Sequence, residues 1–249
     1  MDAGLWFTQL NVWQVMLVGL AFFAALYVLG GWSMQALTRA LHQRGIGRVL
    51  DTRPVKPEQL HREWRQSLHS VLIFGTGMVV PWGLLQLGWA HLAPTASTGR
   101  VLLEIVALML WNDVHFWVNH RLLHTRWLSR FHTDHHRSYV TTPWSTYSFH
   151  PIEALMLGNI ILLPMVVHDF YFWSLAAVPV LSLVLNVIGH SNYDFFPRVS
   201  DTHPLAASRR HHLHHARPKG NYGFALAFMD QWMRTQAEPW TPPPAKGSH

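Results

Sequence analysis

The residues of this sequence with the clearest chemical potential are its histidines. The chain holds 19 histidines against 13 Asp and Glu residues. Three tightly spaced groups stand out: His120 with His124, His132 with His135 and His136, and His211 with His214 and His215. On a helix, residues three and four apart share one face, so each group is expected to direct its imidazoles the same way and to act as a metal clip.

The number and type of these side chains predict two metal ions. Imidazole suits iron, zinc, copper and nickel, and the three groups exceed the four ligands that one tetrahedral zinc takes. The chain has no cysteine, which excludes thiolate catalysis, disulfides and cysteine-bound metal centres. The isolated histidines are interpreted as ordinary surface or interface residues: His42, His61, His69, His91, His115, His168 and His249.

Long uncharged stretches predict that these histidines belong to an integral membrane protein. Hydrophobic residues make up 49% of the chain and charged residues 13%. No Asp, Glu, Lys or Arg lies between Ala3 and Thr38 or between Gln66 and Gly99, and ~20 apolar residues suffice to cross a bilayer. Five apolar segments are expected, at 12–32, 68–92, 101–118, 152–167 and 170–190. The fourth is short enough to be half of a re-entrant hairpin that turns at His168 and Asp169.

The basic residues predict the orientation of these segments. If all five alternate in direction, only Arg100 lies on the opposite side from the other Lys and Arg residues, which by the positive-inside rule marks their side as cytoplasmic. The histidine groups fall on that side. The net charge of +6 is therefore attributed to loops beside a membrane and not to nucleic-acid binding. Met1–Trp6 lacks the basic stretch of a secretory signal, so a retained first span is expected, and a bacterial inner membrane is the expected location.

An ordered set of motifs surrounds the histidines. It consists of HRLLH (120–124), HTDHH (132–136), HPIE (150–153), HSN (190–192), HHLHH (211–215) and NYG (221–223). From about Asp113 to Asp230 the sequence resembles the fatty acid hydroxylase and sterol desaturase superfamily of membrane-bound di-iron oxygenases. The resemblance implies an all-α fold in which an integral membrane helical bundle of four to five apolar segments carries a cytosolic, histidine-rich helical cap.

The same resemblance implies which residues bind the metals. Carried over by position, the ligands are His120, His124, His132, His135, His136, His190, His211, His214 and His215. Five further residues are candidates for additional ligands or for groups that orient the ligands: Asp113, His150, Glu153, Asp194 and His212.

Alternatives stay open for these five. Asp194 follows His190 by four residues and is either a ligand or an orienting carboxylate. Asp113 is either an acceptor for a ligand N–H or a polar residue at the membrane boundary. His212 is a ligand or, preferably, a solvated neighbour, whereas His150 and Glu153 are expected to brace the site. The segment Met229–Thr235 reads MDQWMRT where many relatives have a WDRxFGT pattern, so this end is expected to close the site differently.

The domain organisation follows from these assignments. Residues 1–100 are expected to form N-terminal membrane helices with a basic cytoplasmic loop, which includes an exposed linker at Gly45–Pro57. Residues 101–237 are expected to form the di-iron hydroxylase-like catalytic domain, and 238–249 a disordered tail.

The function that this reading predicts is O2-dependent oxidation of a lipid by two iron ions, with hydroxylation preferred and desaturation left open. Cleaving an unactivated C–H bond requires a redox-active metal, which zinc is not. Aromatic residues near the motifs are candidates to line a lipid slot: Phe116, Trp117, Trp144, Tyr147 and Phe149. Since the chain has no dinucleotide motif, the electrons must come from a ferredoxin or cytochrome with its reductase.

Two alternative functions belong to different classes. A membrane zinc hydrolase would use metal-activated water, but HExxH is absent and carboxylates near the histidines are few. A non-catalytic metal transporter or storage protein would place polar residues along its spans, whereas the first two spans carry almost none.

Overall fold

The fold was analysed in a computed structural model, which describes residues 3–238. The described chain is mostly helical, with only two-residue strands. Its elements are α1 (Ala3–Gln9), α2 (Val12–Gln43), β1 (Arg48–Val49), α3 (Pro57–Gly77), α4 (Val79–Gln86), β2 (Leu92–Ala93), α5 (Thr98–Leu123), η1 (Ser129–Phe131), α6 (Thr133–His136), η2 (Pro143–Tyr147), α7 (Pro151–Gly158), α8 (Leu162–Val167), β3 (Phe170–Tyr171), α9 (Phe172–Gly189), β4 (Tyr193–Asp194), η3 (Pro204–Ala206), α10 (Ala207–Ala216) and α11 (Phe228–Trp232). The expected all-α class is confirmed.

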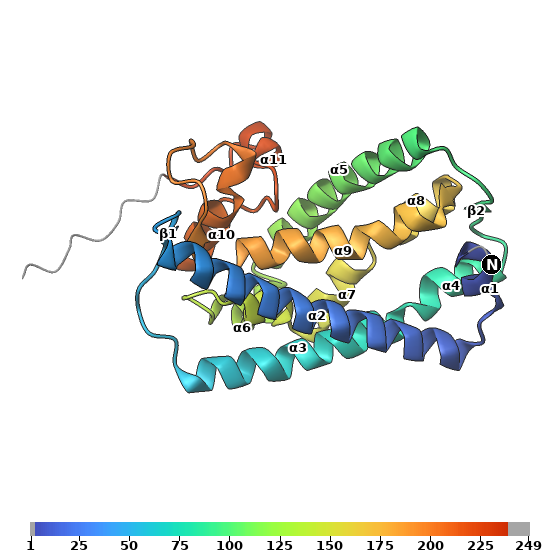
Figure 1. The fold of residues 1–249 in the computed structure, drawn as a ribbon, viewed down its shortest axis with the longest axis horizontal. Coiled ribbons are helices and arrows are strands. Elements are labelled where there is room, and N and C mark those ends of the chain that lie inside the picture. Colours follow the sequence, from blue (N-terminus) through green and yellow to red (C-terminus); the bar gives the residue numbers. More distant parts are fainter. Residues whose placement is uncertain (1–2, 239–249) are drawn as a thin grey trace, which may run out of the picture.

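Four helical stretches within the described residues are long and apolar enough to cross a membrane: Val12–Gln43, Pro57–Gln86, Thr98–Leu123 and Phe172–Gly189. They lie side by side as a bundle (Figure 1). The first begins at Asn11, whose side chain accepts a hydrogen bond from the Gln14 backbone N–H while the Gln14 side chain bonds back, a capping box that fixes the helix start. This membrane bundle was expected. Polar turns lengthen the first helix at its C-terminus and the third at both ends, whereas the second begins and ends earlier than predicted and the last lies within 170–190.

The fourth predicted segment is not one helix. It consists of α7 and α8, separated by a break around Asn159, and Pro151–Val167 is too short to count with the four long helices. The chain nevertheless reverses after it: α8 lies toward the end of the bundle that holds α1 and α4, where β3 pairs in parallel with β2, and α9 runs back toward α10 (Figure 1). The chain therefore turns at His168–Asp169, between α8 and β3, as predicted from the sequence.

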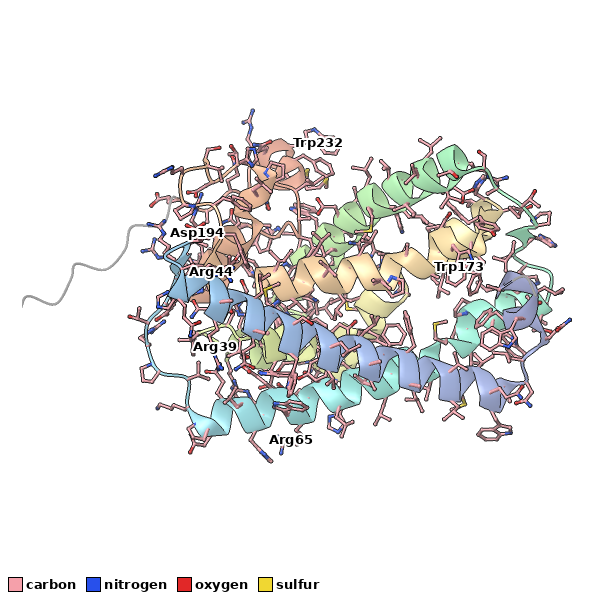
Figure 2. The ribbon with its side chains drawn as sticks, viewed as in Figure 1. Arg39, Arg44, Arg65, Trp173, Asp194 and Trp232 are labelled. Atoms are coloured by element: carbon pink, nitrogen blue, oxygen red, sulfur yellow. The ribbon has the colours of Figure 1, made fainter. Side chains whose placement is uncertain are left out.

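The opposite end of the bundle carries the histidine-rich cap. There β1 pairs antiparallel with β4, and α6, α10 and α11 cover the ends of the long helices (Figure 1). Arg39, Arg44 and Asp194 lie at this end, whereas Trp173 lies at the other (Figure 2). The basic residues of the first loop thus lie on the same end as the cap.

The linker at Gly45–Pro57 is less free than expected. Its strand β1 is paired, and Leu50 is buried. Gly47 has φ +74°, and a Cβ there would meet the Asp194 backbone oxygen at 2.6 Å, so only glycine fits this turn. Of the predicted tail, residues 239–249 lie outside the described residues.

Helices α2 and α3 pack closely through small residues. A Cβ on Gly19 would lie 2.2 Å from the Gly75 carbonyl oxygen, so the two backbones touch where both residues lack side chains. Further along, Phe23, Tyr27 and Trp144 join the core that this pair of helices forms with η2. This packing holds η2, and with it the segment that follows α6 and its histidines.

Candidate metal centre

Each of the nine candidate ligands lies at a helix end or on a short helix of the cap. His120 lies in the last turn of α5 and His124 caps that helix, while His190 caps the C-terminus of α9. The other six lie on α6 with its N-terminal cap and on α10: His132, His135, His136, His211, His214 and His215. Two membrane helices and two cap helices therefore converge on one place.

The nine histidines form two groups, in each of which the ligand atoms lie within 4.8 Å of one another. The five-histidine group consists of His120, His124, His132, His136 and His214, and the four-histidine group of His135, His190, His211 and His215. The expectation that each sequence triplet points in one direction is wrong. Adjacent helical residues differ by about 100°, so His135 and His136 join different groups, as do His214 and His215.

Backbone carbonyls fix the tautomer of four of these rings. The Nδ1 atoms contact the carbonyl oxygens of Tyr222 (His120, 2.9 Å), Ser148 (His135, 3.3 Å), Asn186 (His190, 2.9 Å) and Gly220 (His214, 2.7 Å). A carbonyl oxygen can only accept, so Nδ1 carries the proton and Nε2 presents a lone pair. These rings are thereby prepared to bind a cation through Nε2.

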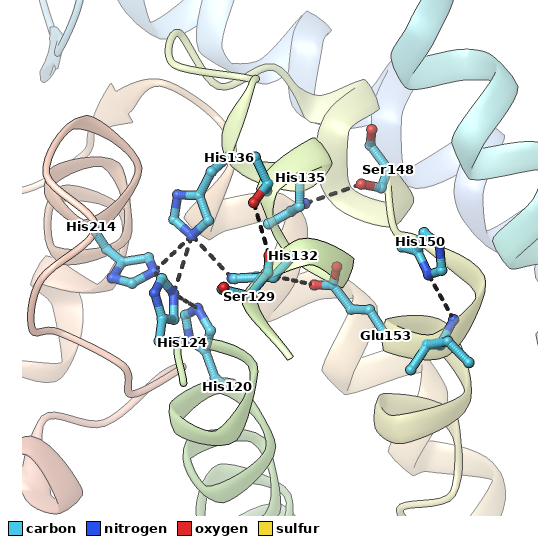
Figure 3. Close-up of polar contacts among 12 residues, drawn as sticks. His120, His124, Ser129, His132, His135, His136, Ser148, His150, Glu153 and His214 are labelled. Carbon is cyan, nitrogen blue, oxygen red and sulfur yellow. Dashed lines mark hydrogen bonds and ion pairs between the residues drawn. The ribbon is translucent and has the colours of Figure 1, made fainter. Parts of the chain in front are cut away.

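In the five-histidine group the Nε2 atoms lie close to one another (Figure 3). The Nε2 of His214 lies 3.0 Å from that of His124 and 3.1 Å from that of His136. Burial lowers the pKa of His214 to about 3 and that of His124 to about 4, so both rings are neutral near pH 7. These closely spaced ring nitrogens could bind one metal ion together, so the five-histidine group is a suitable metal site.

The four-histidine group is completely buried and fits a second metal. The Nε2 of His190 lies 3.1 Å from that of His211 and 3.3 Å from that of His135. Burial lowers the pKa of His190 to about 4. Both ring nitrogens of His215 are buried without a hydrogen-bond partner in residues 3–238, a cost that a metal bond to one of them would reduce.

One carboxylate contacts a candidate ligand directly. His132 Nδ1 lies 2.8 Å from Glu153 Oε1, and both residues are buried. Such a carboxylate orients the ring and raises its basicity as a ligand. His150 instead caps α7 through the backbone N–H of Ile152 and belongs to neither group.

The other proposed auxiliary residues lie elsewhere. Asp113 accepts the backbone N–H groups of Ala225 and Leu226, not a histidine N–H. Asp194 binds Arg209 at 2.8 Å and Arg48 at 3.1 Å, so it anchors α10 and β1 away from both groups.

His212 also differs from the preferred expectation. It is only 2% exposed, so it is not a solvated neighbour, and it belongs to neither metal group. Of the isolated histidines within the described residues, none joins a group, although His115 lines the cavity described below. His249 lies outside the described residues.

Asp230 is a buried residue whose role the sequence reading did not identify. It accepts the backbone N–H groups of Tyr222 and Gly223 at 3.0 and 2.7 Å, and also the Trp117 indole N–H at 3.0 Å. Asp230 thus holds the loop whose Tyr222 carbonyl orients His120. The signal was present in the segment MDQWMRT, which keeps the Asp and Thr of the family pattern, and Thr235 Oγ1 donates to Asp230 as well.

An apolar cavity of about 260 Å³ lies among the helices below the histidines. A narrower pocket joins it to them: this pocket is lined by His120, His132, His135, His190 and His211 and shares Phe116, Phe149, Leu157 and Asn186 with the cavity. The cavity therefore leads to both groups. Exposed residues on its wall, such as Val80 and Leu155, place its opening on the lateral surface of the bundle.

Three of the five aromatic residues expected to line a lipid slot do line this cavity, namely Phe116, Tyr147 and Phe149. Trp117 does not, because its indole is committed to Asp230. Trp144 stacks on Trp64 with ring centroids 4.6 Å apart and packs into the helix core instead.

Comparisons with known proteins agree with this geometry. A family model described as fatty acid hydroxylase matches residues 105–235, more than half of the chain. The chain is 27% identical to Protein CER1-like 1 of Arabidopsis thaliana, over 78% of this chain and 32% of that protein. It is 28% identical to very-long-chain aldehyde decarbonylase GL1-11 of Oryza sativa subsp. indica (53% and 52%), and 32% identical to Delta(7)-sterol 5(6)-desaturase of Eremothecium gossypii (39% and 30%). The chain thus spans about a third to a half of the length of these relatives, and no solved structure matches it.

Proposed function

The chain belongs to the fatty acid hydroxylase family, and on that basis we propose that it is a membrane-bound oxygenase that uses two irons and O2 to hydroxylate a lipid. The observation that carries the proposal is an apolar cavity that leads to two groups of neutral histidines. Iron bound by these groups would supply the oxidising power for C–H cleavage, which zinc lacks. Residues 101–237 would form the catalytic part.

The chain's own residues would position the metals and the lipid. Backbone carbonyls and Glu153 hold the imidazoles in the tautomer that ligation needs. The cavity wall, with Phe116 and Phe149 beside the histidines, would exclude water and direct one carbon of the lipid toward the metals. A lateral opening suits a substrate that arrives from the bilayer.

The positive-inside rule supports placing the site on the cytoplasmic face, because the basic loops lie at the same end as the cap. The relatives named above are from plants and a fungus, so location in a bacterial inner membrane stays a prediction.

The metal content of purified protein tests the function. Protein expressed with ample iron and purified in detergent is expected to contain about two irons per chain and, with O2 and a reductant, to add oxygen to long-chain lipids. Product analysis by mass spectrometry distinguishes hydroxylation from desaturation. A single tightly bound zinc with no O2 consumption would refute the proposal.

Access through the cavity gives a second test. Gly77 lines the cavity and Gly83 does not, yet an added Cβ would meet nothing within 4 Å at either position. Gly77→Phe should fill the opening and lower lipid oxidation by roughly 10²-fold, the loss typical of a misplaced substrate, while metal content stays unchanged. Gly83→Phe is the matched control and should keep its activity. Equal activity of the two variants would argue against the cavity as the lipid path.

An acidic ferredoxin or cytochrome is the proposed electron donor. The proposed docking surface consists of Arg121, Arg217 and Lys219. The Arg121 guanidinium lies 4.9 Å from the centroid of the Tyr222 ring. Arg217 and Lys219 are exposed and precede Gly220, whose carbonyl orients His214. No Asp or Glu occurs in 202–229. High salt should slow reduction by such a donor.

The charge of this surface can be reversed as a check on the donor. Arg217→Glu should slow reduction, whereas Arg65→Glu, on the outer face of α3 (Figure 2), should not. Stopped-flow reduction of the iron-loaded protein measures both, and a rate insensitive to salt and to Arg217→Glu would exclude this docking surface.

A further inference from the structure

Two polar side chains lie at the same depth in the wall of the apolar cavity. Asn112 on α5 comes eight residues before His120, and Ser182 on α9 comes eight residues before His190. At 1.5 Å per helical residue, each lies about 12 Å along its helix from the histidine. Ser182 Oγ donates to Asn112 Oδ1 at 3.3 Å, so the two helices present one polar site.

The hydrogen-bonding capacity of this pair is not used up. Asn112 is only 4% exposed, yet its Nδ2 has no partner among residues 3–238, whereas the other amide nitrogens on the cavity wall are paired. Asn186 Nδ2 donates to the Thr146 carbonyl at 3.2 Å, and Asn159 Nδ2 to the Leu155 carbonyl at 3.3 Å. An amide donor at the wall of an apolar cavity is unfavourable while it lacks an acceptor.

A link between α5 and α9 alone does not account for this arrangement. The Ser182–Asn112 hydrogen bond satisfies the serine hydroxyl and ties the helices together, as polar pairs in membrane bundles do. It leaves the two amide hydrogens of Asn112 unused at the wall of a cavity that leads to the histidines. What these hydrogens lack is an acceptor oxygen, which a lipid in the cavity can bring.

We infer that Asn112 and Ser182 bind a hydroxyl or carbonyl oxygen of the substrate, about 12 Å from the carbon held at the histidines. The substrate class is then a lipid with an oxygen function beside Asn112 and Ser182, and not a plain hydrocarbon. The oxygen accepts from Asn112 Nδ2, and it sets which carbon reaches the metals. The position of the oxidised carbon rests on the proposed function, but the binding of the oxygen does not.

Binding to metal-free protein tests the inference without any reaction. Hexadecan-1-ol and heptadecane differ by a hydroxyl in place of a methyl group, and each can compete with tritiated hexadecan-1-ol for protein in nanodiscs. The wild-type protein is expected to prefer the alcohol by roughly three- to tenfold, the contribution of one hydrogen bond. Asn112→Leu, which keeps the shape of the side chain, should abolish the preference, and Ser182→Ala should reduce it.

Ser174→Ala is the matched control for Ser182→Ala, because Ser174 is also on α9 and is buried, but it does not line the cavity. It should keep the preference. The inference is overturned if the wild-type protein shows no preference, or if Asn112→Leu retains the full preference. Thermal unfolding shows whether that variant is folded; if it is not, Ser182→Ala decides in the same way.

Product analysis separates this inference from the proposed function. In iron-loaded protein, alkan-1-ols of different length should be oxidised at a constant number of carbons from the hydroxyl, and Asn112→Leu should broaden the product positions. An alcohol preference without oxidation would refute the oxygenase proposal and leave the binding site standing. Oxidation counted from the methyl end would overturn the binding site and leave the oxygenase.

Discussion

Replacing His135 and His136 together should weaken the binding of both metals, whereas replacing His135 and His215 together should remove one metal and leave the other in place. The reason is that neighbours in sequence belong to different groups, while His135 and His215 share one. In His135→Ala/His136→Ala the two groups keep four and three histidines, so the metal content measured by elemental analysis should fall through weaker binding at both sites. In His135→Ala/His215→Ala it should fall to about one.

A parallel pair of variants serves as the control. His132→Ala/His136→Ala removes two ligands of the five-histidine group and should also leave one metal, held by the fully buried group. Lipid oxidation should be lost in all three double variants, because the proposed reaction needs both metals. Identical metal binding in His135→Ala/His136→Ala and His132→Ala/His136→Ala would mean that the triplet His132, His135 and His136 acts as a unit, contrary to the geometry.

Glu153→Ala should weaken the metal held by the five-histidine group by about 10- to 100-fold, the usual effect of removing a carboxylate that orients a ligand. Glu153 contacts His132 and no ligand of the other group. Titration with a competing chelator should therefore release one metal earlier than in the wild-type protein and the second at the unchanged concentration. Glu153→Gln keeps an acceptor for the His132 ring, so its first metal should be released at a chelator concentration between those of Glu153→Ala and the wild-type protein.

Asp113→Asn is the matched control for Glu153. Asp113 is another buried carboxylate within residues 101–237, but its hydrogen bonds within residues 3–238 come from backbone N–H groups alone. Its replacement should lower the unfolding temperature and leave both chelator midpoints unchanged. If Asp113→Asn released a metal as easily as Glu153→Ala, the difference in their contacts would have no role in metal affinity.

The sequence by itself determined the kinds of atoms and the kind of environment. A chain without cysteine and with histidines three and four apart leaves nitrogen as the main donor for any metal. Long uncharged stretches predicted membrane helices, because ~20 consecutive apolar residues suffice to cross a bilayer. Motif order indicated the family and brought in His190, which spacing alone did not identify.

The tertiary structure decided how these residues are shared. Helical spacing relates residues only within one helix, whereas each metal group collects rings from several helices. Consequently the triplets divide, and of the candidate carboxylates Glu153 alone reaches a ligand, while Asp113 and Asp194 hold backbone and arginine partners.

The cavity is the other feature that only the packing could define. Asn112 and Ser182 lie 70 positions apart in the chain, and neither belongs to a motif. Their shared depth arises because α5 and α9 run in the same direction and both end at the histidines. Local sequence fixes which atoms can bind a metal or a lipid, but distances between separate helices depend on how the whole bundle packs.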